Sequence, residues 1–291
     1  MSKVHWLALC TLPGVGGATV REVIQRFGRV EAVFDMPDEE LLVVKRLAKV
    51  LPQLRAVSLD AVRVELGDMI DGGIHVLTWD DTEYPANLRP LRDAPPILYA
   101  QGTLLPQDEK AVAIIGSRQP SPPAVEWAAT LGRELAARGL TIVSGLAVGI
   151  DTAAHQGALQ AEGGRTLAVL GSGLNRIHPR QNTELAQAIS ERGALLSEQP
   201  PDEPVRKQSM MIRNRLISGL SRAVIVVEAQ STLNSGSLDT AKRAINQGRP
   251  LMAVPGSPGA DALLLAGAIP IRPDALDFDY LCHLVGHGLG E

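Results

Sequence analysis

Residues 111–118 read AVAIIGSR, an unbroken apolar run that ends directly in a turn of glycine, serine and arginine. Apolar runs rich in β-branched residues are typical of strands that are covered on both faces. Similar runs recur at Ala111–Ile115, Leu140–Val143, Thr166–Leu170, Ala194–Leu196, Ala223–Val227 and Pro250–Val254. Amphipathic stretches lie between them, at Val125–Arg138, Ile150–Glu162, Asn182–Arg192 and Leu238–Gln247. This alternation indicates βαβ units, so residues 111–291 are predicted to form a Rossmann-like, doubly wound, mostly parallel α/β sheet.

Residues 1–70 are predicted to form a small helical domain of the helix-hairpin-helix or SAM-like kind. An apolar turn over Leu7–Leu12, the loop Pro13-Gly14-Val15-Gly16, a helix over Thr19–Phe27 and two further helices around 38–49 and 53–66 make up this part. In helix-hairpin-helix modules, backbone amides of such a loop contact DNA phosphate. A helix-to-helix turn that needs glycine at positive φ explains the loop equally well.

Residues 71–110 read as an extended connector. It opens at Asp71-Gly72-Gly73, and prolines interrupt much of its length. Two short edge strands are expected in it, over Ile74–Leu77 and Ile97–Tyr99.

The bulk composition excludes several classes of protein. A hydrophobic content of 45% over 291 residues suits a globular fold rather than a disordered chain. Cys10 and Cys282 have no metal-type spacing, and so few cysteines fit a reducing compartment. No signal peptide or membrane span is recognisable, and the protein is expected in the cytoplasm. Because the net charge is −4, affinity for a polyanion requires a local patch of positive charge.

The turns that follow the predicted strands are rich in glycine and serine. Ligands of open parallel sheets bind at the carboxyl ends of the strands, where small residues let backbone N–H groups approach an anion. The turn residues include Gly116, Ser117, Arg118, Ser144, Gly145, Gly171, Ser172, Gly236 and Ser237. Helix packing alone explains one glycine-containing turn. Several such turns at one edge of the sheet, with Arg118 beside them, favour a phosphate-bearing ligand.

The segment 205–227 is basic and contains no acidic residue. Its cations are Arg206, Lys207, Arg213, Arg215 and Arg222. Arg213 and Arg215 flank Asn214, and each guanidinium is able to fork onto a phosphate. A solvated helix face or ion pairs to the sheet would also account for such a run. Beside the glycine-rich rim, phosphate binding is the favoured interpretation.

Recognisable catalytic motifs are missing from the sequence. Asp151 and His155 lie four apart on a predicted helix, but a first-turn acid favoured by the helix dipole and a packed histidine explain them without chemistry. Glu198 and Glu228 end strands. No nucleophile elbow, P-loop or complete dinucleotide fingerprint is found. We therefore expect no catalysis, no metal site and no cofactor.

In order and spacing, these motifs resemble the DprA/Smf family of DNA-processing proteins. The resembling stretches are Ile115–Arg118, Ser144–His155, Arg213–Ser221, Ser235–Ala241 and Val254–Gly256, together with Asp81–Pro85 and the hairpin Pro13–Gly16. They extend over nearly the whole chain, and the ordered set is much more specific than any single piece.

The resemblance implies a non-enzymatic protein that binds single-stranded DNA and promotes loading of the RecA recombinase in DNA uptake, natural transformation and recombination. It also implies a homodimer through the C-terminal part of the Rossmann-like domain. Phosphates would be held by Arg118 and by the group Lys207, Arg213 and Arg215. The nucleic-acid-binding residues expected from the rim and the resemblance are Gly116, Ser117, Arg118, Ser144, Gly145, Lys207, Met210, Arg213, Asn214, Arg215, Gly236 and Ser237.

Three features depart from the family pattern. Met210 stands where an aromatic residue usually stacks on a base, so part of the roughly 1–3 kcal/mol per base of aromatic stacking is lost. Asp261 stands in a shortened loop where asparagine is common, and an acid near the pocket would repel phosphate. The sequence stops at Glu291, and no winged-helix domain of the kind that some members carry is expected.

Two other functions stay open from the sequence. One is a nucleotide-binding sensor or phosphoribohydrolase-like enzyme of the related lysine-decarboxylase-like superfamily, although the catalytic glutamate of that signature is missing from residues 234–240. The other is a scaffold that contacts RecA without affinity for DNA.

Overall fold

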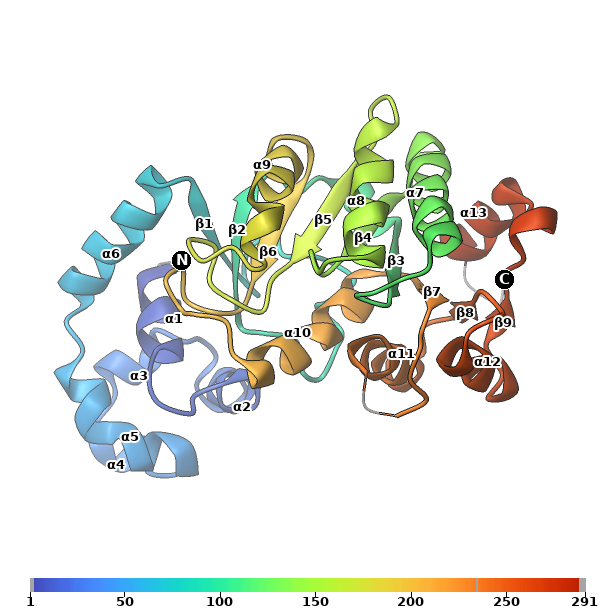
Figure 1. Ribbon diagram of the computed structural model, residues 1–291. Helices are drawn as coiled ribbons and strands as arrows, with labels where there is room; N and C mark the ends of the chain where they lie inside the picture. The colour runs from blue at the N-terminus through green and yellow to red at the C-terminus, as the bar shows by residue number, and fades with distance from the viewer. Residues whose placement is uncertain (1–2, 234, 288–291) are drawn as a thin grey trace.

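A nine-stranded sheet forms the centre of the computed structural model, which describes residues 3–233 and 235–287. The strand order is β1-β2-β6-β5-β4-β3-β7-β8-β9, and helices cover both faces (Figure 1). All neighbours from β6 to β9 in this order are parallel, whereas β2 pairs antiparallel with both β1 and β6. The predicted Rossmann-like, mostly parallel α/β sheet is confirmed.

The six predicted parallel strands begin and end within one residue of the expected positions. They are β3 (Ala111–Gly116), β4 (Thr141–Ser144), β5 (Thr166–Val169), β6 (Ala194–Ser197), β7 (Ala223–Glu228) and β8 (Leu251–Ala253). Alternate residues of β3 enter different cores: Ala113 packs on one face of the sheet, and Val112 and Ile114 on the other. The uninterrupted apolar run therefore reflects burial on both faces. The short edge strand β9 (Ile269–Pro270) has no such run and is not expected from the sequence.

Helices cover both faces of the parallel part of the sheet (Figure 1). Helices α7 (Pro122–Ala137), α8 (Ile150–Gln160) and α9 (Thr183–Arg192) lie on one face, and α10 (Lys207–Leu220), α11 (Gly236–Asn246) and α12 (Pro258–Leu265) on the other. Helix α13 (Phe278–His287) packs beside α7. Three 3₁₀ turns complete the elements, η1 (Pro106–Glu109), η2 (Arg180–Asn182) and η3 (Pro273–Ala275). None of the helices in the described residues is long and apolar enough to cross a membrane.

The N-terminal helices share a core with the sheet. They are α1 (Lys3–Cys10), α2 (Gly17–Phe27), α3 (Ala32–Asp35), α4 (Asp38–Leu41), α5 (Lys45–Ala56) and α6 (Leu59–Asp71). Trp6 and Leu7 of α1 belong to the same buried cluster as Ala168 and Leu195 of the parallel strands. The strands β1 (Ile74–Thr78) and β2 (Ile97–Gly102) extend the sheet itself, because β2 pairs with β6.

Two helix boundaries in this part differ from the sequence-based expectation. A break was expected near Pro52, but α5 continues through this proline to Ala56. The next helix starts after Ser58, whose side chain accepts a hydrogen bond from the backbone N–H of Ala61 at 3.2 Å. This N-cap sets the boundary more strongly than the proline does. The expected apolar turn over 7–12 is helical as far as Cys10.

The direction of the chain switches between β3 and β7. From β3 the chain runs outward through β4, β5 and β6, and it then crosses back to β7 on the other side of β3. Loops on the two sides of such a point diverge and leave a crevice at the carboxyl ends of the strands.

Reciprocal glycines bring α7 and α8 close together. A Cβ atom at Gly157 of α8 would lie 2.0 Å from the backbone oxygen of Ala129, and one at Gly132 of α7 would lie 2.3 Å from the oxygen of Ala154. Neither neighbour is the end of a flexible side chain, so these two positions admit only glycine at the observed helix separation.

We expect Gly157→Ala to lower the free energy of unfolding by about 1–3 kcal/mol, because the added methyl group forces two packed helices apart. Gly67→Ala in α6 is the matched control, since a Cβ atom there meets nothing within 4 Å. It should raise stability by about 0.5–1 kcal/mol through helix propensity alone. Urea denaturation of both variants measures the difference. Equal stabilisation by the two substitutions would contradict the close helix contact.

Candidate nucleic-acid interface

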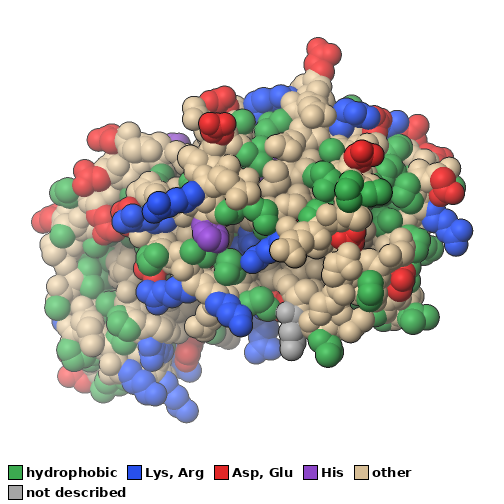
Figure 2. Space-filling view, in the orientation of Figure 1, with side chains coloured by type: hydrophobic (Ala, Val, Ile, Leu, Met, Phe, Trp, Pro, Cys, Tyr) green, Lys and Arg blue, Asp and Glu red, His purple; other side chains and the backbone are tan. Residues whose placement is uncertain are grey.

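A groove opens along the carboxyl ends of the strands at the switch point. Its larger pocket, of about 390 Å³, lies between the turn after β3, the loop after β7 and the first turns of α10 and α11. A smaller pocket of about 70 Å³ reaches the turns after β4 and β5. Arg118, Met210 and Arg213 line both pockets, so we call the two together the rim groove. Figure 2 shows Lys and Arg side chains gathered near the middle of this face.

The rim groove brings together ten of the twelve nucleic-acid-binding residues expected from the sequence. Gly116, Ser117, Arg118, Lys207, Met210, Arg213, Asn214, Gly236 and Ser237 line the larger pocket, and Gly145 lines the smaller one. Ser144 does not line either pocket. Its buried hydroxyl donates to the carbonyl of Ile114 at 2.7 Å and so ties β4 to β3.

Two cations of the rim groove are open to a ligand. Arg118 and Lys207 are exposed, and neither forms an ion pair within residues 3–233 and 235–287. Nη2 of Arg118 lies 3.7 Å from Sδ of Met210, which places the guanidinium against the helix on the other side of the groove. A guanidinium without a carboxylate partner keeps its full fork of donors for an anion.

Arg213 carries a buried positive charge beneath the rim groove. Its side chain is 6% exposed, and Nη1 donates to the carbonyls of Gly145, at 2.7 Å, and Val169. Burial lowers the pKa of Arg213 to about 10, against the opposing charge of Asp151 and with the nearby charge of Arg118. Arg213 is therefore still charged at neutral pH. It braces the ends of β4 and β5 and raises the positive potential of the groove from below.

Arg215 lies outside the rim groove, contrary to the expectation that it joins Arg213. Residues two apart on a helix point to opposite faces. The guanidinium of Arg215 forms a two-pronged ion pair with Glu198 at 2.7 and 2.6 Å, and it lies 3.6 Å from Asp93. The segment 205–227 has no acid of its own, but the end of β6 supplies one.

Asn214 links α10 to the start of α11. Its Nδ2 donates to Oδ2 of Asp239 at 3.0 Å and to the carbonyl of Gly236 at 3.3 Å. The hydroxyl of Ser235 caps α11 by accepting from the backbone N–H of Leu238 at 3.2 Å. Gly236 itself is exposed at the edge of the rim groove. The first turn of α11 is thus held in place with its amino end at the groove, which suits an anion.

Asp151 and His155 are both buried and bonded within the fold. The carboxylate of Asp151 accepts hydrogen bonds from the backbone N–H groups of Gly145, at 3.1 Å, and Ala147, at 3.4 Å. Burial raises the pKa of Asp151, against the charge of Arg213 and these backbone donors. Thr166 donates its hydroxyl proton to the carbonyl of Ile142, so Nδ1 of His155 is the donor to Thr166 at 2.6 Å.

The two remaining acids near the strand ends also have local partners. Glu228 accepts from the backbone N–H and the hydroxyl of Ser121, the latter at 2.6 Å, at the start of α7. Asp261 accepts from the backbone N–H of Gly256 at 2.9 Å. Neither side chain lines the rim groove. Asp261 is therefore not placed to repel a phosphate bound there, contrary to the expectation from the sequence.

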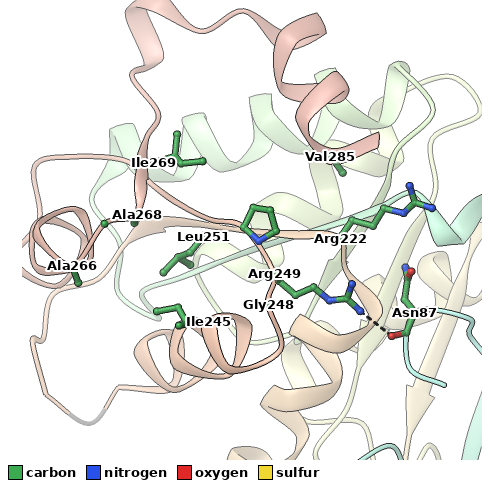
Figure 3. A pocket seen from close by; sticks show the side chains of 12 residues that line it. Asn87, Arg222, Ile245, Gly248, Arg249, Leu251, Ala266, Ala268, Ile269 and Val285 are labelled. Carbon is green, nitrogen blue, oxygen red and sulfur yellow. Dashed lines mark hydrogen bonds between the residues drawn. The ribbon is translucent and has the colours of Figure 1, made fainter. Parts of the chain in front are cut away.

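A separate pocket lies outside the rim groove, at the amino ends of strands β7, β8 and β9 (Figure 3). Asn87, Arg222 and Arg249 line one side of it, and Ile245, Leu251 and Ile269 line the other. Nη2 of Arg249 donates to the carbonyls of Asn87, at 2.9 Å, and Gly219, at 3.2 Å. Of the expected nucleic-acid-binding residues, none lines this pocket.

Sequence reasoning missed part of the rim groove. His178 and Pro179, from the long loop after β5, line the smaller pocket beside Met210. Gln230 and Ser231, from the loop after β7, line the larger one. These residues follow strand ends, as the expected ones do, but His178 and Pro179 stand several positions beyond the turn Gly171–Gly173, and Gln230 and Ser231 stand before the turn Ser235–Ser237. No motif marks them.

Comparisons with known proteins agree on one family. A sequence model of the family described as DNA recombination-mediator protein A matches residues 75–268. Protein Smf of Escherichia coli strain K12 is 45% identical over 202 residues, which cover 67% of this chain and 53% of that protein. This chain spans about half to two thirds of the length of the curated relatives that it matches.

Two solved structures are also similar. The X-ray structure of DNA processing protein A from Streptococcus pneumoniae has a TM-score of 0.77 and 31% identity, over 93% of this chain and 95% of that one. DNA processing protein A from Helicobacter pylori, in a structure that concerns its single-stranded DNA binding mode, has a TM-score of 0.63 and 33% identity. That similarity covers 72% of this chain and 94% of that one.

His155 makes the stability of the fold depend on pH. Burial lowers the pKa of His155 to about 3, whereas the unfolded chain binds the same proton near pH 6.5. Between these values unfolding takes up a proton, so the free energy of unfolding falls as the pH falls. Between pH 7 and pH 5 we expect the free energy of unfolding to fall by about 2 kcal/mol less in His155→Asn than in the wild type. Urea denaturation at both pH values measures it, and equal losses would contradict the buried neutral imidazole.

Proposed function

The chain belongs to the DNA recombination-mediator protein A family, and from this premise we propose that it binds single-stranded DNA in the rim groove and promotes loading of RecA onto the strand. One observation carries the proposal. In a chain with a net charge of −4, Arg118 and Lys207 are exposed, have no carboxylate partner within residues 3–233 and 235–287, and line one groove together with the buried, charged Arg213.

The chemistry of the groove suits the phosphodiester backbone. Arg118 presents a planar fork that matches phosphate oxygens, and Lys207 adds a mobile point charge. Gly236 leaves room for the backbone of the strand at the start of α11, because a Cβ atom there meets nothing within 4 Å. These groups recognise phosphate and not base edges, so the proposal is binding that tolerates any sequence and weakens steeply with salt.

The proposed action is binding without catalysis. Asp151 and His155, the nearest acid–base pair, are occupied by the hydrogen bonds that hold the loop after β4 and strand β5. Family membership favours this function over the phosphoribohydrolase-like alternative, whose catalytic glutamate is missing from residues 234–240. Within that stretch, Asn234 lies outside the described residues.

We further propose a homodimer in the cytoplasm with RecA as its partner. Two apolar side chains in the C-terminal part of the chain support the dimer: Leu265 of α12 is 92% exposed and Ile245 of α11 is 53% exposed. Burying both against a second copy would remove apolar surface from water.

Arg118→Ala and Lys207→Ala should each weaken binding to an oligothymidine. If each side chain neutralises one phosphate, the slope of log K against log salt becomes shallower by about 0.7 per variant, because fewer counterions are released. Fluorescence anisotropy titrations at several salt concentrations measure affinity and slope together.

Arg133→Ala is the matched control. Arg133 is an exposed arginine toward the far end of α7, paired with Glu134 at 3.1 Å, so its loss should leave both quantities unchanged. Wild-type protein that fails to bind the oligonucleotide at low salt would refute the proposed function.

A further inference from the structure

A second acid-free segment borders the rim groove. No aspartate or glutamate occurs from residue 163 to residue 183, which includes the loop between β5 and α9. Arg176, His178 and Arg180 lie at alternate positions of this loop, and all three side chains are exposed. None of them has a hydrogen-bonding or ionic partner for its side chain within residues 3–233 and 235–287. A loop that carries three unpaired basic side chains has the composition of an anion-binding surface.

This loop forms the wall of the smaller pocket opposite α10. His178 and Pro179 line that pocket together with Arg118, Met210 and Arg213. Basic segments from two distant parts of the chain therefore meet at one cavity, and the earlier one supplies an aromatic ring.

Backbone hydrogen bonds hold the loop in position. The N–H of Gly173 donates to the carbonyl of Glu203 at 2.8 Å, and the N–H of Asn175 donates to that of Pro201 at 2.9 Å. At its far end, Nδ2 of Asn182 donates to the carbonyl of Leu146 at 2.8 Å. The loop is thus anchored on both sides of His178, so ordering this side chain on a ligand costs little conformational entropy.

Aromatic surface is scarce in the rim groove. The chain has three Phe, three Tyr and three Trp, and none of them lines either pocket. Met210 is packed from below, because a Cβ atom at Gly171 would lie only 2.9 Å from its Cα. The imidazole of His178 is the one flat ring among the described residues that line the groove.

We propose that His178 is a base-stacking residue of the rim groove, opposite the thioether of Met210, and that Arg176 and Arg180 contact the phosphates on either side of the stacked base. The inference rests on the proposed function and deepens it. The strand then runs between α10 and the loop after β5, which line the same pocket. Stacking requires only the π face of a base, so it preserves binding to any sequence.

The test compares an oligothymidine with an abasic strand of equal length. His178→Ala should weaken binding to the oligothymidine by about fivefold or more, which corresponds to about 1 kcal/mol of lost stacking, and by less than about twofold to the abasic strand. His178→Phe should keep the affinity for the oligothymidine. Arg176→Ala/Arg180→Ala should weaken binding to both strands to the same extent and make the salt slope shallower. His75→Ala, an exposed histidine on β1, is the control and should change nothing.

The outcomes separate the inference from the function on which it rests. If the wild type binds and His178→Ala binds equally well, the stacking role is wrong while the proposed function stands. Equal losses on both strands, or a loss in His178→Phe as large as in His178→Ala, would show that the imidazole acts on the backbone and would also overturn it. A wild type that binds neither strand would refute both. Thermal unfolding of each variant confirms that it is folded.

Discussion

A guanidinium buried beneath the rim groove constrains everything around it. Burying an unpaired charge costs several kcal/mol, so Arg213 has to be surrounded by compensating groups. The carbonyls that end β4 and β5 accept its hydrogen bonds, and Asp151 supplies the opposing charge. A Cβ atom at Gly145 would lie 2.4 Å from Nη1 of Arg213, so a larger residue there would displace the guanidinium from these carbonyls.

The same arrangement shapes the loop after β4. Asp151 accepts from the N–H groups of Gly145 and Ala147, so the carboxylate that balances Arg213 also sets the path of the chain between β4 and α8. At the end of that loop Gly149 has a φ of +85°, and a Cβ atom there would lie 2.4 Å from the backbone oxygen of Ser117. The turns after β3 and β4 are therefore packed against each other, and Arg118 leaves this contact on the groove side.

An acidic chain thus presents a basic groove by distributing its cations unequally. Arg215 and Glu198 neutralise each other on the far side of α10. Arg213 is charged and largely buried at the wall of the groove, and Arg118 and Lys207 remain at the surface. The net charge of the chain says little about the potential at this site, because screening confines each charge to about 10 Å at moderate salt.

The sequence alone predicts the six parallel strands β3 to β8 to within one residue, since burial on both faces leaves an unbroken apolar run that is visible locally. It also places the ligand edge, because glycine and serine follow the strands in a parallel sheet. It does not predict the ion pair of Arg215 with Glu198. It also does not predict that α5 continues through Pro52 and that α6 begins at the cap Ser58. Nor does it predict that the loop after β5 lies beside Met210 in one pocket. Composition and periodicity show which residues need burial, a charge partner or a hydrogen-bond partner, because these needs follow from the residue type. Only the tertiary structure decides which distant residue supplies the partner.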